Sequence, residues 1–345
     1  MPVQTRIGQQ DGWTEVRGWS FAAILARFGF PALRLLYREG CLEPLISIKP
    51  WAAGPVHVGG VLERPLMAYR SILVDADDTA PSKARVEAAV ALAARFKSAL
   101  TGVFLKSDFL ALYGAGSALA FIPPESIQLI LEEQAKAVAK AAAAARAIFE
   151  GAARGAGIAS DWLEIEGDRD TTLIECARRH DLTIFPALAS ASIGQHHVTA
   201  GTVGMGSGAP VLVLPADGFK SPIGRRVLVA WKGSRESARA LNDAWPFLSE
   251  ADEVHILTVR TDGENVSDPM LERQMRLHGC KQPRIIVDRG DDASTGEILR
   301  RHISATGADL VVMGLYGHSR VEELVFGGVS RQLLNALPVP LLVSH

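Results

Sequence analysis

The chain has 345 residues, of which 48% are hydrophobic and 21% are charged, and its formal net charge is -2. This length exceeds the size at which one hydrophobic core usually stops growing, so two domains are expected. The near-neutral charge argues against a broad basic surface for nucleic acid and gives no reason to expect an anionic membrane partner.

Residues 1–66 lie outside the pattern that organises the rest of the chain. Their most apolar stretch, residues 19–37, contains two arginines and Pro31, so it matches neither a transmembrane helix nor a signal peptide. Its basic, apolar character also suits an interfacial helix. We expect residues 1–66 to be a peripheral or disordered extension, with Met67 as an alternative start of the natural product.

From residue 67 onward the same order of elements occurs twice. Residues 71–74 form an apolar run that precedes Asp77 and an amphipathic helix, and residues 226–229 precede Lys232 and a second such helix. Three further pairs follow in the same order: 165–168 with 287–291, 181–185 with 309–313, and 209–214 with 339–343. A repeat of this kind indicates two similar folding units.

The apolar runs of both repeats lack a clean alternation and are separated by helical stretches. This pattern is typical of parallel strands that helices cover on both faces. The sequence therefore predicts an α/β fold with two tandem doubly wound parallel-sheet domains. We place them at residues 67–216 and 223–345, joined by a short linker that contains Gly218 and Pro222.

A glycine-rich segment follows the fourth apolar run of the second repeat. Its glycines are Gly314, Gly317, Gly327 and Gly328, and a new helix is expected to start near Ser330. Glycines let a backbone approach a phosphate, and a helix start presents unpaired N–H groups to an anion. The alternative is that these glycines only form turns and that Ser330 only caps a helix.

This segment resembles the Gly-x2-Gly-x9-Gly-[Ser/Thr] loop of the universal stress protein family, and residues 339–343 resemble the terminal strand of that family. The resemblance covers the second repeat, and the internal repeat extends it over residues 67–345. It implies a Rossmann-like fold of the adenine nucleotide alpha hydrolase type. It also implies a non-catalytic stress-response protein, located in the cytoplasm, that binds ATP or another adenine nucleotide at the glycine loop of the second repeat.

The resemblance implies specific nucleotide contacts. Phosphate and ribose contacts would come from Gly314, Gly317, Gly327 and Gly328, with Val329 and Ser330 beside them. Adenine-side contacts would come from Ala230, Val259 and Met313.

Two residues of the second repeat depart from the family's pattern. Gly328 replaces a Ser or Thr, and the lost hydroxyl should cost about 1 kcal/mol of binding energy. Lys232 replaces the acidic residue that holds ribose hydroxyls, at a cost of roughly 1.5–3 kcal/mol. Lys232 is then either a solvated surface lysine or a group that reaches a phosphate. We expect weakened binding that depends more on the phosphates than on the sugar.

The first repeat departs in the opposite way. Asp77 supplies the acidic residue, but Pro186 and Ala189 stand at the places of Gly314 and Gly317. Proline lacks the N–H that a phosphate oxygen would accept. We therefore expect Asp77 to cap the following helix or to face water, and no nucleotide to bind in this repeat.

The two repeats are also expected to pair with each other. The terminal strands, Val211–Leu214 and residues 341–343, would lie at sheet edges, and an exposed apolar edge is an aggregation hazard unless it is covered. The resemblance implies an intrachain pseudo-dimer through these strands. No nucleic acid, membrane or specific protein partner is predicted.

Other functional classes have less support in the sequence. The three cysteines are widely spaced, and His196 and His197 have no carboxylate or cysteine partner nearby in the sequence, so no metal site is predicted. No Gly-x4-Gly-Lys loop or triad spacing occurs, so no catalytic residue is predicted and a nucleotide hydrolase is the weakest alternative. A nucleotide-independent interaction module, with both sites decayed, is the second hypothesis.

Overall fold

The computed structural model describes residues 68–106, 124–165, 169–187, 200–216, 218–261, 268–280, 282–290, 294–315 and 338–345, together with three short strands nearer the start of the chain. The chain divides into two compact units, Met1–Arg64 and Pro65–His345. The first unit contains an antiparallel sheet of β1 (Gln9–Gln10), β2 (Trp13–Glu15) and β3 (Leu36–Tyr37). Apart from these strands, the predicted extension of residues 1–66 lies outside the described residues.

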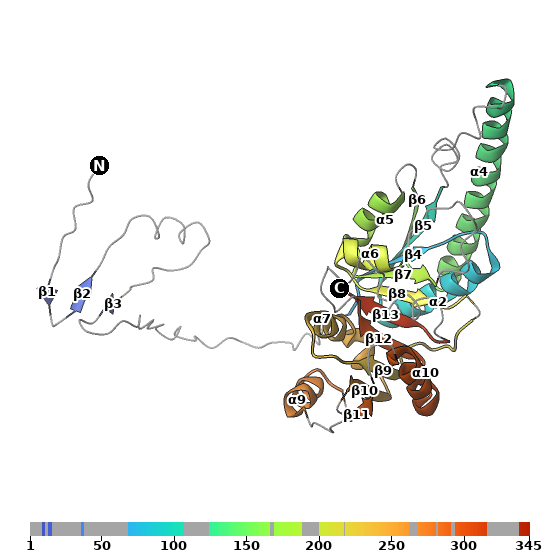
Figure 1. Cartoon of the computed structure of the whole chain (residues 1–345). Helices are drawn as coiled ribbons and strands as arrows, with labels where there is room; N and C mark the ends of the chain where they lie inside the picture. The colour runs from blue at the N-terminus through green and yellow to red at the C-terminus, as the bar shows by residue number, and fades with distance from the viewer. Residues whose placement is uncertain are drawn as a thin grey trace. The chain divides into compact units, whose positions relative to one another are not determined.

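A ten-stranded sheet runs through the second unit, with helices on both of its faces (Figure 1). Its strands are β4 (Ser71–Asp75), β5 (Ala99–Leu105), β6 (Ser160–Ile165), β7 (Leu182–Pro186), β8 (Val211–Leu214), β9 (Arg226–Ala230), β10 (Glu253–Arg260), β11 (Pro283–Arg289), β12 (Leu310–Gly314) and β13 (Leu341–Ser344). Their order is β11-β10-β9-β12-β13-β8-β7-β4-β5-β6. Neighbouring strands within each repeat are parallel. Counted outward from the middle of the sheet, each repeat contributes its fifth strand, then its fourth, first, second and third. The predicted α/β fold is confirmed.

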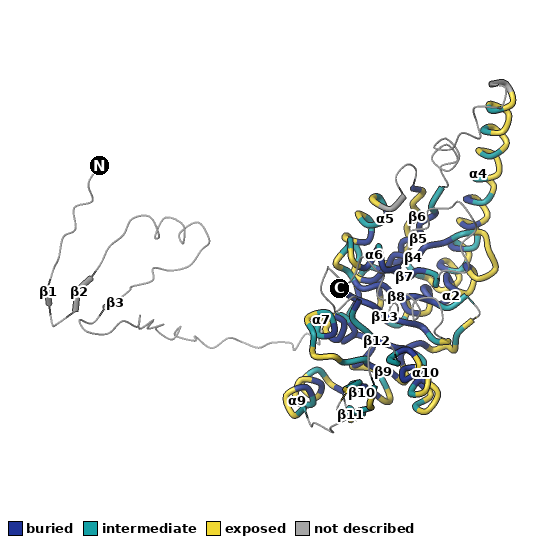
Figure 2. Tube along the Cα trace, viewed as in Figure 1, coloured by how far each residue is buried: buried dark blue, intermediate teal, exposed yellow. Residues whose placement is uncertain are grey.

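Two sets of helices cover the two faces of this sheet. One face packs against α2 (Ala80–Phe96), α4 (Pro124–Gly155), α7 (Arg235–Asp243), α8 (Trp245–Leu248) and α9 (Pro269–Leu277). The other face packs against α5 (Arg169–Ala177), α6 (Ala200–Ser207) and α10 (Thr295–Thr306). The inner strands are largely buried between these layers, whereas the edge strands β6 and β11 are mostly exposed or half-buried. Many of the other exposed residues lie on the outer sides of the helices (Figure 2). No helix in the described part of the chain is long and apolar enough to cross a membrane.

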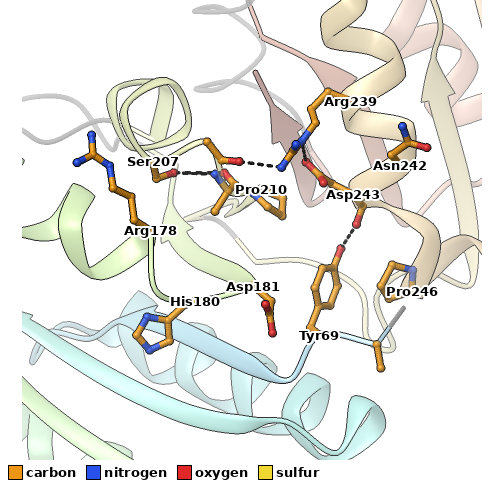
Figure 3. A pocket seen from close by; sticks show the side chains of 13 residues that line it. Tyr69, Arg178, His180, Asp181, Ser207, Pro210, Arg239, Asn242, Asp243 and Pro246 are labelled. Atoms are coloured by element: carbon orange, nitrogen blue, oxygen red, sulfur yellow. Dashed lines mark hydrogen bonds and ion pairs between the residues drawn. The ribbon is translucent and has the colours of Figure 1, made fainter. Parts of the chain in front are cut away.

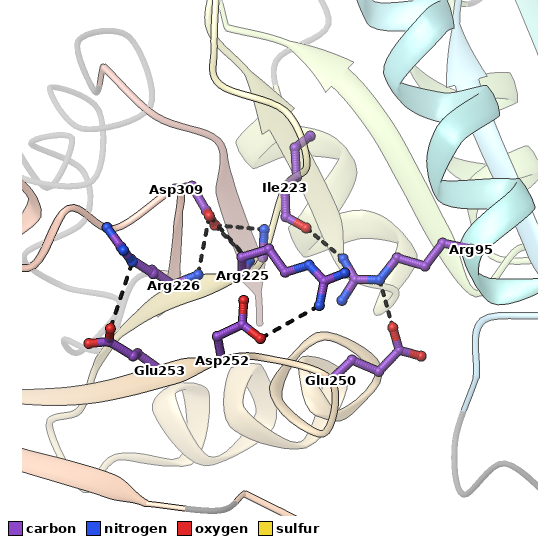
Figure 4. Close-up of polar contacts among 9 residues, drawn as sticks. Arg95, Ile223, Arg225, Arg226, Glu250, Asp252, Glu253 and Asp309 are labelled. Carbon is purple, nitrogen blue, oxygen red and sulfur yellow. Dashed lines mark hydrogen bonds and ion pairs between the residues drawn. The ribbon is translucent and has the colours of Figure 1, made fainter.

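One polar contact occurs at the same place in both repeats. Asp309, immediately before β12, accepts hydrogen bonds from the amides of Gly224 and Arg225 at 2.7 and 2.9 Å (Figure 4). Asp181, immediately before β7, accepts bonds from two amides at the start of β4 at 2.7 and 3.0 Å. Each carboxylate therefore links the start of the first strand of its repeat to the start of the fourth. This contact explains why an aspartate precedes the fourth strand in both repeats.

The two repeats meet in the middle of the sheet. The strands that the sequence predicts to pair are neighbours there: β8 and β13 run antiparallel, with Leu212 opposite Leu342. Both of these side chains are completely buried. Because each strand has a partner on both sides, neither presents an open edge.

Aromatic side chains from both repeats pack beside this junction. The rings of Tyr69, Phe96 and Phe247 lie 5.2 to 5.8 Å apart, centroid to centroid. The Arg95 guanidinium lies 5.1 Å from the Phe96 ring, and its Nε donates to Glu250 at 2.7 Å (Figure 4). One hydrophobic cluster therefore continues from the first repeat into the second.

Candidate functional site

The three predicted adenine-side residues lie at the carboxyl ends of adjacent parallel strands. Ala230 ends β9, while Val259 and Met313 each lie one residue before the end of β10 and β12. Strand β9 pairs with both neighbours, and Leu257 of β10 lies opposite Ala230. All three side chains are partly buried on the face of the sheet that α10 covers. The structure thus brings these three residues together.

The loop between β9 and α7 carries Lys232, whose side chain is exposed. Gly233 follows with φ of 70°, a left-handed conformation that favours glycine. Helix α7 then begins with a reciprocal capping box. The amide of Ser237 donates to Ser234 Oγ at 3.3 Å, and the amide of Ser234 donates to Ser237 Oγ at 3.0 Å. The start of α7 is therefore stabilised by its own side chains.

Gly314 is the member of the predicted glycine loop that the structure describes, and a packing contact explains it. A Cβ at this position would lie 2.5 Å from the carbonyl carbon and 2.7 Å from the Cβ of Glu236 in α7. Helix α7 therefore rests directly on the end of β12. The sequence interpretation assigned this glycine to phosphate approach, and the observed contact requires it for helix packing as well.

Replacing Gly314 with alanine should destabilise the second unit by about 1–3 kcal/mol, because overpacking a close backbone contact forces the helix to shift. Gly151 provides the control, because a Cβ there meets nothing within 4 Å. Its replacement by alanine should stabilise helix α4 by roughly 0.5–1 kcal/mol. Urea denaturation of both variants tests the contact, and equal effects of the two changes would contradict it.

The remaining predicted loop residues are Gly317, Gly327, Gly328, Val329 and Ser330, and they lie outside the described residues. Their roles stay predictions. Ala189 of the first repeat also lies outside the described residues, whereas Pro186 ends β7 opposite Leu214 of β8.

The equivalent strand end of the first repeat is filled by its own side chains. Asp75 ends β4, and Arg85 from α2 reaches over it. Arg85 Nε donates to the Asp75 carbonyl at 2.6 Å, and its Nη2 lies 3.2 Å from Asp75 Oδ2 and 2.9 Å from Asp77 Oδ2. The Arg85 side chain is only 4% exposed. This ion pair was not predicted from the sequence.

Asp77 is held within the first repeat by two groups. Its Oδ1 accepts from the amide of Thr79, the N-cap residue of α2, at 2.8 Å, and its Oδ2 pairs with Arg85. Burial opposes ionisation of Asp77, but the hydrogen bonds from Thr79 and the charge of Arg85 outweigh it and lower the pKa of this carboxyl. Asp77 thus anchors the residue that caps α2 and does not occupy the N-cap position itself.

A charged cluster lies at the end of β11. Asp288 Oδ2 is 2.7 Å from His302 Nε2 and also accepts a hydrogen bond from Arg301. The hydrogen bond from His302, assisted by Arg301, outweighs burial and lowers the pKa of Asp288. No group of three or more His, Cys, Asp or Glu side chains that could hold a metal ion occurs among the described residues.

A cavity of about 320 Å³ lies at the amino ends of β4, β7 and β8, beside helix α7, so both repeats contribute side chains to it (Figure 3). Tyr69 donates to the Asp243 carbonyl at 2.5 Å, and Arg239 Nε donates to the Asp243 carboxylate at 2.8 Å. The second guanidinium arm of Arg239 donates to the Gly208 carbonyl at 2.9 Å. The bonds of Tyr69 to Asp243 and of Arg239 to Gly208 therefore join the two repeats. No predicted site residue lines the cavity. The carboxyl ends of the strands therefore remain the candidate site.

Comparison with known proteins identifies similar domains and folds. Residues 224–345 match the model of the universal stress protein family. A universal stress protein from Archaeoglobus fulgidus DSM 4304 is 18% identical, with 79% of this chain and 95% of that chain covered and a TM-score of 0.59. A Pseudomonas aeruginosa UCBPP-PA14 structure described under the same family name is 15% identical, with 80% and 93% covered and a TM-score of 0.50. Both share the fold of this chain, and no curated protein matches it.

Proposed function

From the premise that residues 224–345 form a universal stress protein domain, we propose that this chain is a non-catalytic stress-response protein whose second repeat holds an adenine nucleotide. In open α/β sheets, ligands bind outside the carboxyl ends of the strands, where the strand order reverses. That reversal falls between β9 and β12 in the second repeat, and Ala230 and Met313 lie at this position. This placement carries the proposal.

We propose one site per chain, for ATP or a related adenine nucleotide. The first repeat is unsuited to a ligand because the Arg85 guanidinium already occupies the end of β4, at the place that corresponds to Ala230. Pro186 also removes an amide at the end of β7. The wide separation of the three cysteines in the sequence supports the proposed cytoplasmic location.

Titration calorimetry with ADP, ATP and adenosine tests the proposed site. The wild type should bind one ADP or ATP per chain and should bind adenosine more weakly, because the phosphates supply most of the contacts. Replacing Gly317 with valine should abolish binding, since a branched side chain would enter the phosphate path. Replacing Asp77 with alanine should leave binding unchanged. A stoichiometry of two, or sensitivity to the Asp77 change alone, would contradict this assignment.

The alternative function is a nucleotide-independent interaction module. Two observations favour it: the packing of Gly314 against Glu236 requires this glycine without any ligand, and the capping box of α7 already uses amides at that helix start. The departures at Lys232 and Gly328 agree with it. A folded wild type that binds none of the three compounds would favour this alternative.

We further propose that the two repeats act as an internal pseudo-dimer. The antiparallel pairing of β8 with β13 supports it, because the terminal strand of each repeat covers the edge of the other. The shared cluster around Tyr69, Phe96 and Phe247 adds a hydrophobic contribution to the same junction.

A further inference from the structure

The candidate site of the second repeat carries a basic side chain at the end of each of three adjacent strands. Lys232 follows β9, Arg260 is the last residue of β10, and Arg289 is the last residue of β11. These strands are parallel neighbours, so the three positions share one edge of the sheet. Lys232 and Arg289 are exposed, and Arg260 is half-buried.

The first repeat has a different charge pattern at the equivalent positions. Strand register, continued into the following loops, places Asp77 and Lys106 where the second repeat has Lys232 and Arg260. In the sequence alignment of the repeats, Glu166 corresponds to Arg289. Two acidic residues of the first repeat are thus basic in the second.

Two acidic groups among the described residues near this edge have basic partners. Asp288 is bonded by Arg301 and His302, and Glu236 is paired with Arg235 at 3.1 Å. Lys232 lies in the loop that leaves β9 beside the reversal of the strand order, next to the half-buried Ala230. In nucleotide-binding α/β sheets, an acidic residue near the ribose recognises its hydroxyls, whereas a nearby basic residue accommodates a phosphate on the ribose.

We propose that the second repeat recognises an adenine nucleotide that carries a phosphate on its ribose ring, at the 2′ or 3′ position, with Lys232 as the residue that selects it. This inference rests on the proposed function of the same site. Arg260 and Arg289 add to the positive potential at this edge, and charge-assisted bonds from basic side chains to phosphate are stronger than neutral hydrogen bonds.

The test compares ADP with adenosine 2′,5′-bisphosphate and adenosine 3′,5′-bisphosphate, which carry the same number of phosphates as ADP. Calorimetry on the full chain at fixed ionic strength should show one of the two bisphosphates binding about 10- to 100-fold more tightly than ADP. Which bisphosphate binds identifies the phosphorylated position. Replacing Lys232 with glutamine should remove the preference, and replacing it with aspartate should reverse the preference in favour of ADP.

Arg225 provides the matched control, because it is an exposed basic residue at the opposite edge of the same repeat. Its replacement by glutamine should leave the preference unchanged. If the Arg225 and Lys232 changes had equal effects, the preference would reflect the overall charge of the repeat, and the inference would be wrong. ADP binding as tightly as both bisphosphates would overturn this inference and leave the proposed function standing. Failure of the folded wild type to bind any of the three would overturn both.

Discussion

Replacing Leu342 with proline is expected to lower the free energy of unfolding of the second unit by about 3 kcal/mol or more, a large part of the roughly 5–15 kcal/mol typical of folded proteins. Leu342 lies within the four-residue strand β13, is completely buried, and has neighbours on both sides, β12 and β8. Proline cannot donate to the hydrogen-bond ladder and is rarely tolerated in a central strand. Because β13 joins the two repeats, both should lose structure together.

Circular dichroism during thermal and urea denaturation measures this effect, with Leu342 replaced by isoleucine as the control. Isoleucine keeps the side-chain volume and the backbone amide, so it should cost less than about 1.5 kcal/mol. If the proline variant unfolded cooperatively at the wild-type midpoint, β13 would not be the central strand that joins the repeats.

Replacing Arg85 with methionine should cost about 3–5 kcal/mol at neutral pH, because it removes the cation that the buried Asp75 carboxylate and the half-buried Asp77 carboxylate share. The exposed Arg154, whose contact to Glu150 is 3.9 Å, is the control. The corresponding change there should alter stability by no more than about 0.5 kcal/mol. Equal stability losses in the two variants would contradict the role assigned to Arg85.

The pH dependence of the Arg85 variant has a defined sign. In the wild type the lowered pKa of Asp77 contributes stability that is present above the unfolded pKa, about 3.9, and is lost as the pH falls through the folded pKa. Without Arg85 the carboxyls should bind protons more readily. The stability deficit of the variant should therefore be largest at neutral pH and should shrink as the pH falls toward about 4. A deficit that does not change with pH would show that packing, and not charge, dominates the loss.

The strands and their ends were predictable because they depend on local signals. The apolar runs before Asp77 and Lys232 are short and bounded by polar loops, and the repeat aligned them before any contact was known. The family resemblance, and not these local signals, named Ala230, Val259 and Met313, which lie at the ends of adjacent strands. The identity of the terminal strands followed from their position in each repeat.

The sequence interpretation missed features that depend on contacts between distant parts of the chain. A single basic residue in an amphipathic helix is typical of a solvated face, so Arg85 gave no sign of its burial over Asp75. Alignment of the repeats does carry a signal, because Asp75 and Arg85 correspond to Ala230 and Ala240. The packing of Gly314 on Glu236 could not be recognised in the sequence, because approach to a phosphate and contact with a helix both require a glycine.

The hydrophobic core that the two repeats share was also not predicted from the sequence. Phe96 and Phe247 lie in different repeats, and each fits the buried face of its own helix. Only the mirrored strand order brings the two rings together. Residue periodicity reports which face of a helix is buried, but it does not report which other helix shares the core with it.

Native mass spectrometry of the freshly purified full chain tests directly whether the second repeat holds an adenine nucleotide. It measures how many nucleotides each chain carries and, after release, their identity by mass. We predict one adenine nucleotide per chain in the wild type and none in a folded Gly317→Val variant. Two nucleotides per chain, or one that persists in the Gly317→Val variant, would contradict the assignment of the site to the second repeat.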